Sequence, residues 1–391
     1  MRVCLFTDTL GDVNGVCRFI QDAADRALSS GRELHVLTCT TFRVPDRPTI
    51  HNFPPLYSRP MPGYETLQVV VPPVLAMYRE ALRLRPDVIH LSTPGPVGSV
   101  GRLAAWRLGV PILGVYHTDF PAYIDHLFGD PSYTWLCRAV MREFYRPFRA
   151  IFTRSDDYQD SLVRLGISRD RLLTLLAGVD IERFHPKHRD MSVWDRLGVP
   201  REAVKVLSVG RVSVEKNLPL LVKAWPAARA RGLSQGIDAR LIVVGDGPYR
   251  ASMESELNDS PASGGGGAHF LGFRHGQELS SIYAGSDMFV FPSATDTLGQ
   301  VAMESQASGL PVLVSDRGGP KEVVADGRTG CVLPADRPEA WSEAMGVLIA
   351  DAGMRARMGA AGHAAMQGRS FRHSFEDFWR AHESAAEGRR R

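Results

Sequence analysis

Residues 288–314 read MFVFPSATDTLGQVAMESQASGLPVLV, and this stretch indicates the fold. Two short apolar runs, at 288–291 and 312–314, enclose a polar loop and a segment with helical spacing of apolar residues. A strand, a loop, a helix and a second strand in this order are typical of a parallel sheet covered by helices.

The same alternation runs through most of the chain. Apolar runs of similar length recur at 3–6, 34–37, 88–91, 112–115, 150–153, 204–209, 239–244, 269–271 and 330–333. A polar stretch at 184–190 separates two cycles, and residues 42–73, rich in proline, interrupt the first with an expected surface excursion. We therefore expect an α/β protein with two Rossmann-like, doubly wound domains, 1–186 and 187–370, that face a cleft.

Composition excludes several classes of protein. The 391 residues carry 46 basic and 43 acidic side chains, so the net charge of +3 gives no support for nucleic-acid binding. The five cysteines are widely spaced and indicate free thiols in a reducing compartment. No leader pattern and no apolar run of spanning length is visible, so the expected location is cytoplasmic, with peripheral contact at the inner face of the cell membrane left open.

Two loops that follow predicted strands could bind an anion, because ligands of parallel sheets bind at the carboxyl ends of the strands. The loop at 7–15 contains Gly11 and Gly15, but their spacing does not fit the dinucleotide fingerprint, and a plain turn is the alternative. The loop at 209–217 contains Arg211 and Lys216, a pair that can hold a diphosphate. The alternative there is a solvated basic loop.

The loop at 291–300 combines two acids with a helix start. Asp296 lies in the loop and Glu304 lies eight residues later, on the helix. The backbone amides of Leu298, Gly299 and Gln300 are expected to be free at the helix start. This set suits a ligand that carries both hydroxyls and a diphosphate. The alternatives are a helix-capping role for Asp296 and a surface position for Glu304.

His117 and Asp119 follow another predicted strand, at 112–115. A histidine at the carboxyl end of a strand in the first domain could face a ligand. A purely structural histidine is the alternative.

Together these motifs resemble the GT-B retaining glycosyltransferases of family 4. The resemblance rests on the loop at 7–15, on GVDIERFHP at 178–186, on GRVSVEKN at 210–217 and on Asp296 and Glu304 followed by ASGLP at 307–311. TPGP at 93–96, PGY at 62–64 and HTD at 117–119 look most like the branch of GDP-mannose-dependent α-mannosyltransferases and sulfoquinovosyltransferases.

The resemblance implies a role for each residue around the donor diphosphate. Gly15 would lie against the diphosphate from the first domain, and Arg211 and Lys216 would neutralise its charge. The amides of Leu298, Gly299 and Gln300 would hold the donor sugar and the phosphate. The terminal helix at 371–391 would pack back on the first domain.

It also implies the contacts to the donor's hydroxyl groups. Glu304 would hold the ribose, and His117 would contact the hexose near its reacting carbon. Asp296 stands where the family usually has glutamate and would contact sugar hydroxyls, so the shorter side chain puts sugar selectivity in doubt. Arg154 and Ser155 follow the strand at 150–153 and could face the same ligand.

The implied activity is that of a hexosyltransferase which moves mannose from GDP-mannose to a lipid or glycan, with no metal ion and no cofactor. A UDP-sugar-dependent glucosyl- or sulfoquinovosyltransferase acting on a diacylglycerol-type lipid is the first alternative. An NAD-dependent sugar-nucleotide oxidoreductase or epimerase and a non-catalytic sugar-nucleotide-binding protein are further alternatives.

A basic segment at 138–149 could contact an anionic membrane surface. Four arginines alternate there with apolar side chains. The arginines are Arg138, Arg142, Arg146 and Arg149, and the apolar residues are Met141, Phe144, Tyr145 and Phe148. A helix whose basic face lies in water is the alternative.

Overall fold

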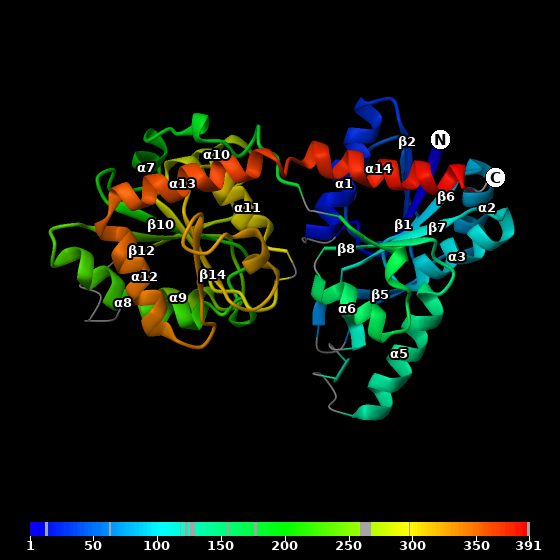
Figure 1. The fold of residues 1–391 in the computed structure, drawn as a ribbon, viewed down its shortest axis with the longest axis horizontal. Coiled ribbons are helices and arrows are strands. Elements are labelled where there is room, and N and C mark those ends of the chain that lie inside the picture. The colour runs from blue at the N-terminus through cyan, green and yellow to red at the C-terminus, as the bar shows by residue number, and fades with distance from the viewer. Residues whose placement is uncertain are drawn as a thin grey trace. The chain divides into compact units, whose positions relative to one another are not determined.

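The computed structural model describes residues 1–11, 15–61, 64–117, 119–121, 124–125, 130–154, 156–175, 178–258, 267–296 and 298–388. The chain forms two compact units. The first comprises Met1–Leu176 and Ser374–Arg391, and the second comprises Ala177–His373. Each unit contains one parallel sheet covered by helices, which confirms the predicted fold class (Figure 1).

The first unit is built on a seven-stranded parallel sheet with the order β3-β2-β1-β6-β7-β8-β9. Its strands are β1 (Arg2–Thr7), β2 (Glu33–Thr38), β3 (Ile50–Asn52), β6 (Val88–Leu91), β7 (Ile112–Tyr116), β8 (Ala150–Thr153) and β9 (Leu172–Thr174). Its helices are α1 (Gly15–Ser29), α2 (Val74–Leu84), α3 (Pro96–Leu108), α5 (Pro131–Tyr145), α6 (Asp156–Arg164) and α14 (Phe371–Glu387). A short 3-10 turn, Arg169–Arg171, precedes β9.

Alternation along the strands divides the core of this sheet between its two faces. Cys4 and Phe6 of β1 belong to a buried cluster that includes Met77 of α2 and Phe144 of α5. Leu5, between them, lines a pocket with residues of α1 and α14 instead. Helices α1 and α14 therefore cover one face, and α2, α3 and α5 cover the other.

The segment at 42–73 is more ordered than expected. Ile50–Asn52 forms β3 and pairs in parallel with β2, from Val36↔Ile50 to Thr38↔Asn52. Tyr57–Met61 (β4) and Tyr64–Val71 (β5) form an antiparallel hairpin. The hairpin lies outside the parallel sheet, as expected of an excursion. The pairing of β3 was not predicted, because β3 is only three residues long, too short to show an alternating pattern.

The second unit is built on a six-stranded parallel sheet with the order β12-β11-β10-β13-β14-β15. Its strands are β10 (Val204–Val209), β11 (Ala239–Val244), β12 (Ala268–Gly272), β13 (Met288–Phe291), β14 (Val312–Ser315) and β15 (Gly330–Leu333). Its helices are α7 (Ser192–Arg196), α8 (Leu218–Leu233), α9 (Arg250–Asn258), α10 (Gly276–Gly285), α11 (Gln300–Ala307), α12 (Pro338–Ala350) and α13 (Ala352–Gln367). The described part of this unit also contains the 3-10 turns Pro186–His188, Val214–Lys216 and Gly319–Val323.

The boundary between the units lies earlier than the predicted boundary after residue 186. Val179 bridges to Ser370, and Phe184 is fully buried in a cluster with Trp194 and Tyr283. The polar stretch that looks like a linker therefore lies within the second unit.

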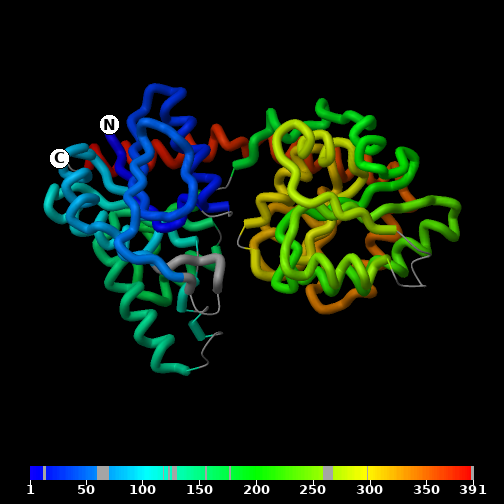
Figure 2. Tube along the Cα trace, turned by 180° about the vertical axis from the view of Figure 1, so that it is seen from behind, coloured from blue at the N-terminus to red at the C-terminus, as the bar shows by residue number. Residues whose placement is uncertain are grey.

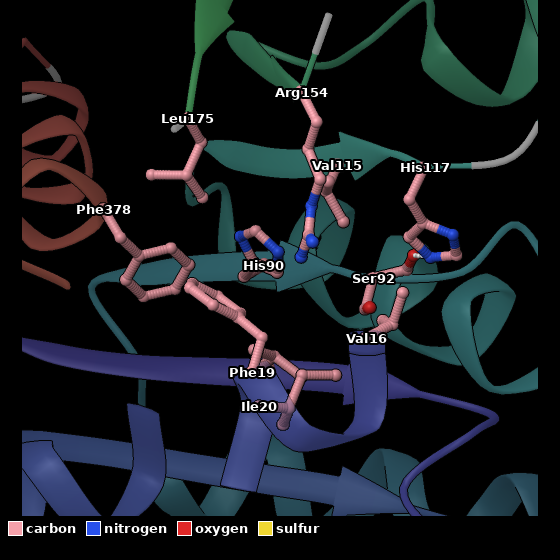
Figure 3. A pocket seen from close by; sticks show the side chains of 11 residues that line it. Val16, Phe19, Ile20, His90, Ser92, Val115, His117, Arg154, Leu175 and Phe378 are labelled. Carbon is pink, nitrogen blue, oxygen red and sulfur yellow. Dashed lines mark hydrogen bonds between the residues drawn. The ribbon is translucent and has the colours of Figure 1, made fainter. Parts of the chain in front are cut away.

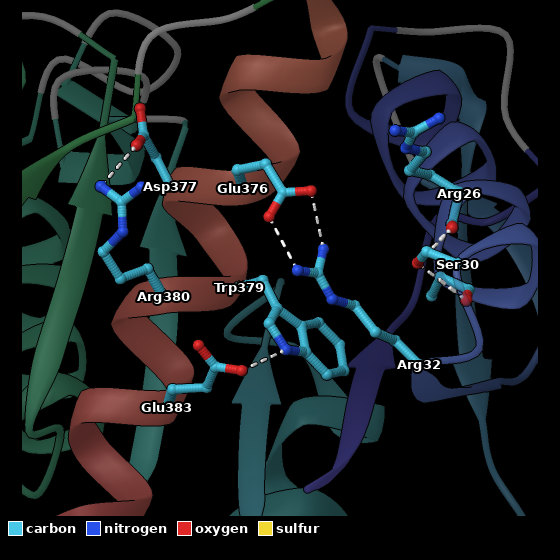
Figure 4. A network of polar contacts seen from close by, with 9 residues as sticks. Arg26, Ser30, Arg32, Glu376, Asp377, Trp379, Arg380 and Glu383 are labelled. Atoms are coloured by element: carbon cyan, nitrogen blue, oxygen red, sulfur yellow. Dashed lines mark hydrogen bonds and ion pairs between the residues drawn. The ribbon is translucent and has the colours of Figure 1, made fainter.

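Helix α14 returns to the first unit, where the red C-terminal segment lies beside the blue and cyan elements in both views (Figure 1, Figure 2). Phe378 contacts the rings of Phe19 and His90. The Arg32 guanidinium donates to both carboxylate oxygens of Glu376 at 2.9 and 2.7 Å and lies 5.3 Å from the centre of the Trp379 ring (Figure 4). Apolar and polar contacts together dock the helix.

Candidate functional site

The strand order places the predicted loops at the switch points of the two sheets. In the first unit β1 and β6 are adjacent strands. The connection after β1 leads to β2 on one side of the sheet, and the connection after β6 leads to β7 on the other side. In the second unit β10 and β13 are the corresponding pair. Open parallel sheets bind ligands at this point. Both switch points therefore carry residues that were predicted from the sequence.

Asp8 joins the two strand ends at the first switch point, a role that the sequence did not reveal. Its backbone N–H donates to Thr93 Oγ1 at 3.1 Å, and the Thr93 hydroxyl donates back to its carboxylate. The Val97 N–H donates to Asp8 Oδ1 at 3.0 Å, so the carboxylate caps α3. A Cβ on Gly95 would lie 2.5 Å from Asp8 Oδ2, which explains a glycine there. Burial raises the pKa of Asp8 despite these bonds.

Gly15 begins α1, next to residues 12–14, which lie outside the described part of the chain. An added Cβ at Gly15 would meet no described atom within 4 Å. The described residues therefore leave room beside the start of this helix.

His117 follows β7 and is half-buried. Its Nε2 lies 2.8 Å from the carbonyl oxygen of Ser92. A carbonyl only accepts, so Nε2 carries the proton in this contact. Burial, and secondly the charge of Arg154, lower the pKa of His117 to about 4. The imidazole is therefore neutral near pH 7 and can act as a hydrogen-bonding group and not as a cation.

The predicted cations of the second unit follow β10. Lys216 ends the 3-10 turn Val214–Lys216, and its Nζ donates to Asp296 Oδ2 at 2.8 Å. Arg211 Nη1 lies 4.0 Å from Glu215 Oε1, and 37% of its side chain is exposed. Asn217 fixes the turn, because its Nδ2 donates to the carbonyl oxygens of Pro292 and Ala335 at 3.3 and 2.8 Å. The turn itself is therefore anchored, and the Arg211 side chain stays partly exposed.

Asp296 does not cap α11, so that alternative is wrong. The cap residue is Gly299, which has a left-handed φ of 72° and is not assisted by a side chain. A Cβ at Gly299 would also lie 2.8 Å from the Cα of Pro320. The Asp296 carboxylate pairs with Lys216 instead.

The start of α11 presents free backbone donors. The amides of Ala302 and Met303 donate to the Gly299 carbonyl at 2.9 and 3.1 Å. Within the described residues, the amides of Leu298, Gly299 and Gln300 donate to no group. They carry the partial positive charge of a helix N-terminus. This arrangement can hold an anion beside the Lys216–Asp296 pair.

Glu304 lies in the interior and not on the surface, which overturns the surface alternative. Only 2% of the residue is exposed, and its Oε2 accepts a hydrogen bond from the Tyr283 hydroxyl at 3.0 Å. A buried carboxylate is costly unless it is hydrogen-bonded, so its position is specified by these neighbours.

The structure brings Lys216 and Asp296 together and places both beside the start of α11. Gly15, His117 and Arg154 belong to the first unit, whereas Arg211, Lys216, Asp296, Leu298, Gly299, Gln300 and Glu304 belong to the second. Thr118 and Ser155 of the predicted motifs, residues 62–63 and the tail at 389–391 lie outside the described residues.

Comparisons with known proteins identify the family. Residues 13–183 match the model of glycosyltransferase family 4, and residues 203–351 match the model of glycosyl transferases group 1. A GDP-mannose-dependent alpha-mannosyltransferase of Mycobacterium tuberculosis is 33% identical over 342 residues, 85% of this chain and 84% of that protein. Sulfoquinovosyl transferase SQD2 of Arabidopsis thaliana is 34% identical over 290 residues, 71% of this chain and 53% of that protein.

Solved structures show the same fold. Anabaena Alr3699/HepE, in complex with UDP, aligns with a TM-score of 0.78 at 18% identity and covers 98% of this chain and 100% of its own. WaaG, a glycosyltransferase involved in lipopolysaccharide biosynthesis, aligns with a TM-score of 0.72 at 17% identity over 96% of this chain and 98% of its own. The family decides against the NAD-dependent alternative. The chain belongs to glycosyltransferase family 4 and is a glycosyltransferase with the GT-B fold.

Proposed function

We propose that the protein transfers mannose from GDP-mannose to a lipid or glycan acceptor with retention of configuration and without a metal ion. The donor is suggested by three relatives, from Mycobacterium tuberculosis, Mycolicibacterium smegmatis and Corynebacterium glutamicum, all named GDP-mannose-dependent alpha-mannosyltransferases. The observation that carries the chemistry is the set of positive groups in the second unit: Arg211, Lys216 and the free amides at the start of α11.

These groups suit the charge that develops in the reaction. Breaking the bond between the anomeric carbon and the phosphate leaves negative charge on the diphosphate. Arg211 and Lys216 would offset that charge, as a divalent ion does in other enzymes, and the amides would add to it. Glu304 would accept hydrogen bonds from the ribose. In a same-face transfer the departing phosphate oxygen takes the proton of the acceptor hydroxyl, whose oxygen bonds to the anomeric carbon.

A chelator experiment tests the role of the cations. Transfer from GDP-mannose should proceed at an unchanged rate in excess EDTA. Loss of activity in EDTA that magnesium restores would refute the metal-free mechanism. A screen of nucleotide sugars by donor hydrolysis, with UDP-glucose included, tests the donor independently.

A second candidate donor is a UDP-linked sulfoquinovosyl group. It is suggested by the similarity to SQD2 over 71% of the chain. The same screen decides between the two donors, because the enzyme should hydrolyse its own donor fastest.

Membrane contact belongs to the same proposal, but through other side chains than the sequence suggested. Met141, Phe144, Tyr145 and Phe148 are buried in the core, so their assignment to a lipid-facing surface was wrong. They are at helical spacing because they pack against the sheet. The four arginines are exposed. The apolar side chains exposed on α5 are Tyr133, Trp135, Leu136 and Val140, between 54% and 70% accessible.

This exposed set favours an anionic lipid surface, since Arg138 and Arg142 share α5 with the exposed apolar side chains. No helix in the described part of the chain has the length and hydropathy to cross a membrane. Co-sedimentation with phosphatidylglycerol vesicles should fall with salt and with Trp135→Ser. Phe273→Ser is the control, because Phe273 is 63% exposed in the second unit. Equal binding by both variants would contradict a role for α5.

A further inference from the structure

A pocket in the first unit lies where three neighbouring strands end, beside the start of α1. Ser92, His117 and Arg154 follow β6, β7 and β8, and Val16 belongs to the first turn of α1 (Figure 3). The remaining lining residues are apolar except His90: Leu5, Phe19, Ile20, Val115, Leu175 and Phe378.

Arg154 is the charged residue of this pocket. Its side chain runs into the pocket between His90 and Val115 (Figure 3). Its Nε is buried and has no hydrogen-bond partner, and within the described residues the guanidinium forms no ion pair. The contact that it does make is with the ring of Phe19, whose centre lies 5.6 Å from Cζ. Burial lowers the pKa of Arg154 to about 10, so the group keeps its charge near pH 7.

The other described polar groups of the pocket do not balance this charge. None of the described residues that line it is a carboxylate. His117 is neutral and donates to the Ser92 carbonyl, and His90 lies 3.1 Å from His382 in a fully buried pair. A guanidinium that is partly removed from water without a counter-charge is destabilising. It becomes favourable when a ligand brings the missing negative charge.

We propose that Arg154 binds an acidic group (a carboxylate, a phosphate or a sulfonate) carried by one of the sugar-transfer substrates. The planar guanidinium presents two parallel N–H donors to such a group. The mostly apolar lining would exclude water and strengthen the contact. That the acidic group belongs to a sugar-transfer substrate rests on the proposed function. That this pocket binds an anion does not depend on the proposed function.

The first experiment measures anion binding to the full chain without turnover. Methanesulfonate, acetate and inorganic phosphate are titrated while the imidazole signals of His117 are followed by NMR. Arg154→Gln should weaken binding by about 10- to 100-fold, because a hydrogen-bonded charge is lost. Arg154→Lys should bind at an intermediate level. Arg164→Gln is the control, because Arg164 is exposed on α6 of the same unit.

A stability measurement separates a ligand-binding role from a structural one. Arg154→Met retains the stem that packs on Phe19 and removes the unpaired charge. It should raise the melting temperature of the ligand-free protein or leave it unchanged. A structural arginine would instead lower that temperature when replaced. A lower temperature together with unchanged anion binding in Arg154→Gln would overturn the proposal, as would failure of the wild-type protein to bind any of the three anions.

Two arms identify which substrate carries the acid. If the donor carries it, Arg154→Gln should slow hydrolysis of UDP-sulfoquinovose and spare GDP-mannose. If the acceptor carries it, the variant should hydrolyse donors normally and lose transfer to phosphatidylinositol but not to diacylglycerol. An equal effect on acidic and neutral substrates in both arms would contradict the assignment. Anion binding that depends on Arg154 would survive even if GDP-mannose proved not to be the donor.

Discussion

At the scale of single residues, the charge of Lys216 in the second unit is already paired with a carboxylate. Lys216 and Asp296 are 21% and 28% exposed and form a direct ion pair, so neither is a free charge before a ligand arrives. A diphosphate would compete with Asp296 for Lys216, and the released carboxylate could then accept hydrogen bonds from a sugar. This exchange links the two roles that the sequence predicted separately.

We expect Lys216→Ala to lower the turnover rate by on the order of 100-fold or more, because its contact strengthens as charge develops on the leaving group. Steady-state kinetics with a saturating donor measure the effect. Lys223→Ala is the matched control, since Lys223 is an exposed lysine on α8. Arg211→Lys should also be impaired, because an ammonium cannot reproduce a two-pronged contact. A fully active Lys216→Ala would remove this residue from the site.

The buried Tyr283–Glu304 hydrogen bond leads to a prediction on stability. Tyr283→Phe should lower the free energy of unfolding by about 1–3 kcal/mol, because it removes a donor to a buried carboxylate. Urea unfolding of the second unit measures the change. Tyr249→Phe is the control, because the Tyr249 hydroxyl donates to Glu256 at a similar distance, 2.9 Å, on the surface. Equal losses in the two variants would show that burial of Glu304 adds nothing.

At the scale of secondary-structure elements, helix α14 is held by a pair of histidines with a defined proton order. His382 Nδ1 lies 2.6 Å from the Phe378 carbonyl and must donate to it. His382 Nε2 is then the acceptor from His90 Nδ1 at 3.1 Å. A proton added to His382 would set two donors against each other. Burial lowers the pKa of His382 from 6.5 to about 4 and also lowers the pKa of His90.

The stability of the first unit should therefore depend on pH. The unfolded chain binds these protons near pH 6.5, whereas folded His382 binds its proton only near pH 4. Neutral His382 therefore contributes fully to the free energy of unfolding above pH 6.5. This contribution is lost as the pH falls towards 4, by on the order of 3 kcal/mol. His382→Gln should flatten this slope in urea unfolding at several pH values. His373→Gln, at an exposed position of the same helix, should leave it unchanged.

The sequence predicted the main strands because buried parallel strands are continuous apolar runs, and all of those runs are strands in the structure. It also predicted the loops after β10 and β13, because charged residues there follow such runs directly. It did not predict the contact of Asp8 with Thr93 or the position of Arg154 beside His90, since these depend on strand order. It assigned Phe144 to the wrong side of α5, because helical spacing alone does not tell the core face from an exposed face.

At the scale of the whole molecule, each unit has its own core and should unfold on its own. The first unit's cluster surrounds Phe6 and Phe144, and the second unit has two clusters, around Phe289 and Trp225. Because the cores are separate, we expect the full chain not to unfold in a single two-state transition.

Calorimetry should resolve two unfolding transitions, one for each unit. GDP should raise the midpoint temperature of the transition that belongs to the second unit. At 100 times the dissociation constant, the stabilisation is about 2.7 kcal/mol. Tyr283→Phe identifies that transition by lowering it, and His382→Gln identifies the other by its response to pH. Lys216→Ala should reduce the shift caused by GDP. A shift confined to the first unit's transition would contradict the assignment of the nucleotide site.

The return of α14 to the first unit has a consequence for the order in which the chain matures during synthesis. Strands β1 to β9 are synthesised before the second unit, whereas Ser374–Arg391 follows it. The second unit is continuous and can close as soon as it is complete, because domains generally fold as units. Until α14 has been synthesised, one face of the first sheet lacks Phe378 and His382. The apolar residues of that face stay exposed and can bind chaperones or misfold. The first unit is thus begun before the second unit and completed after it.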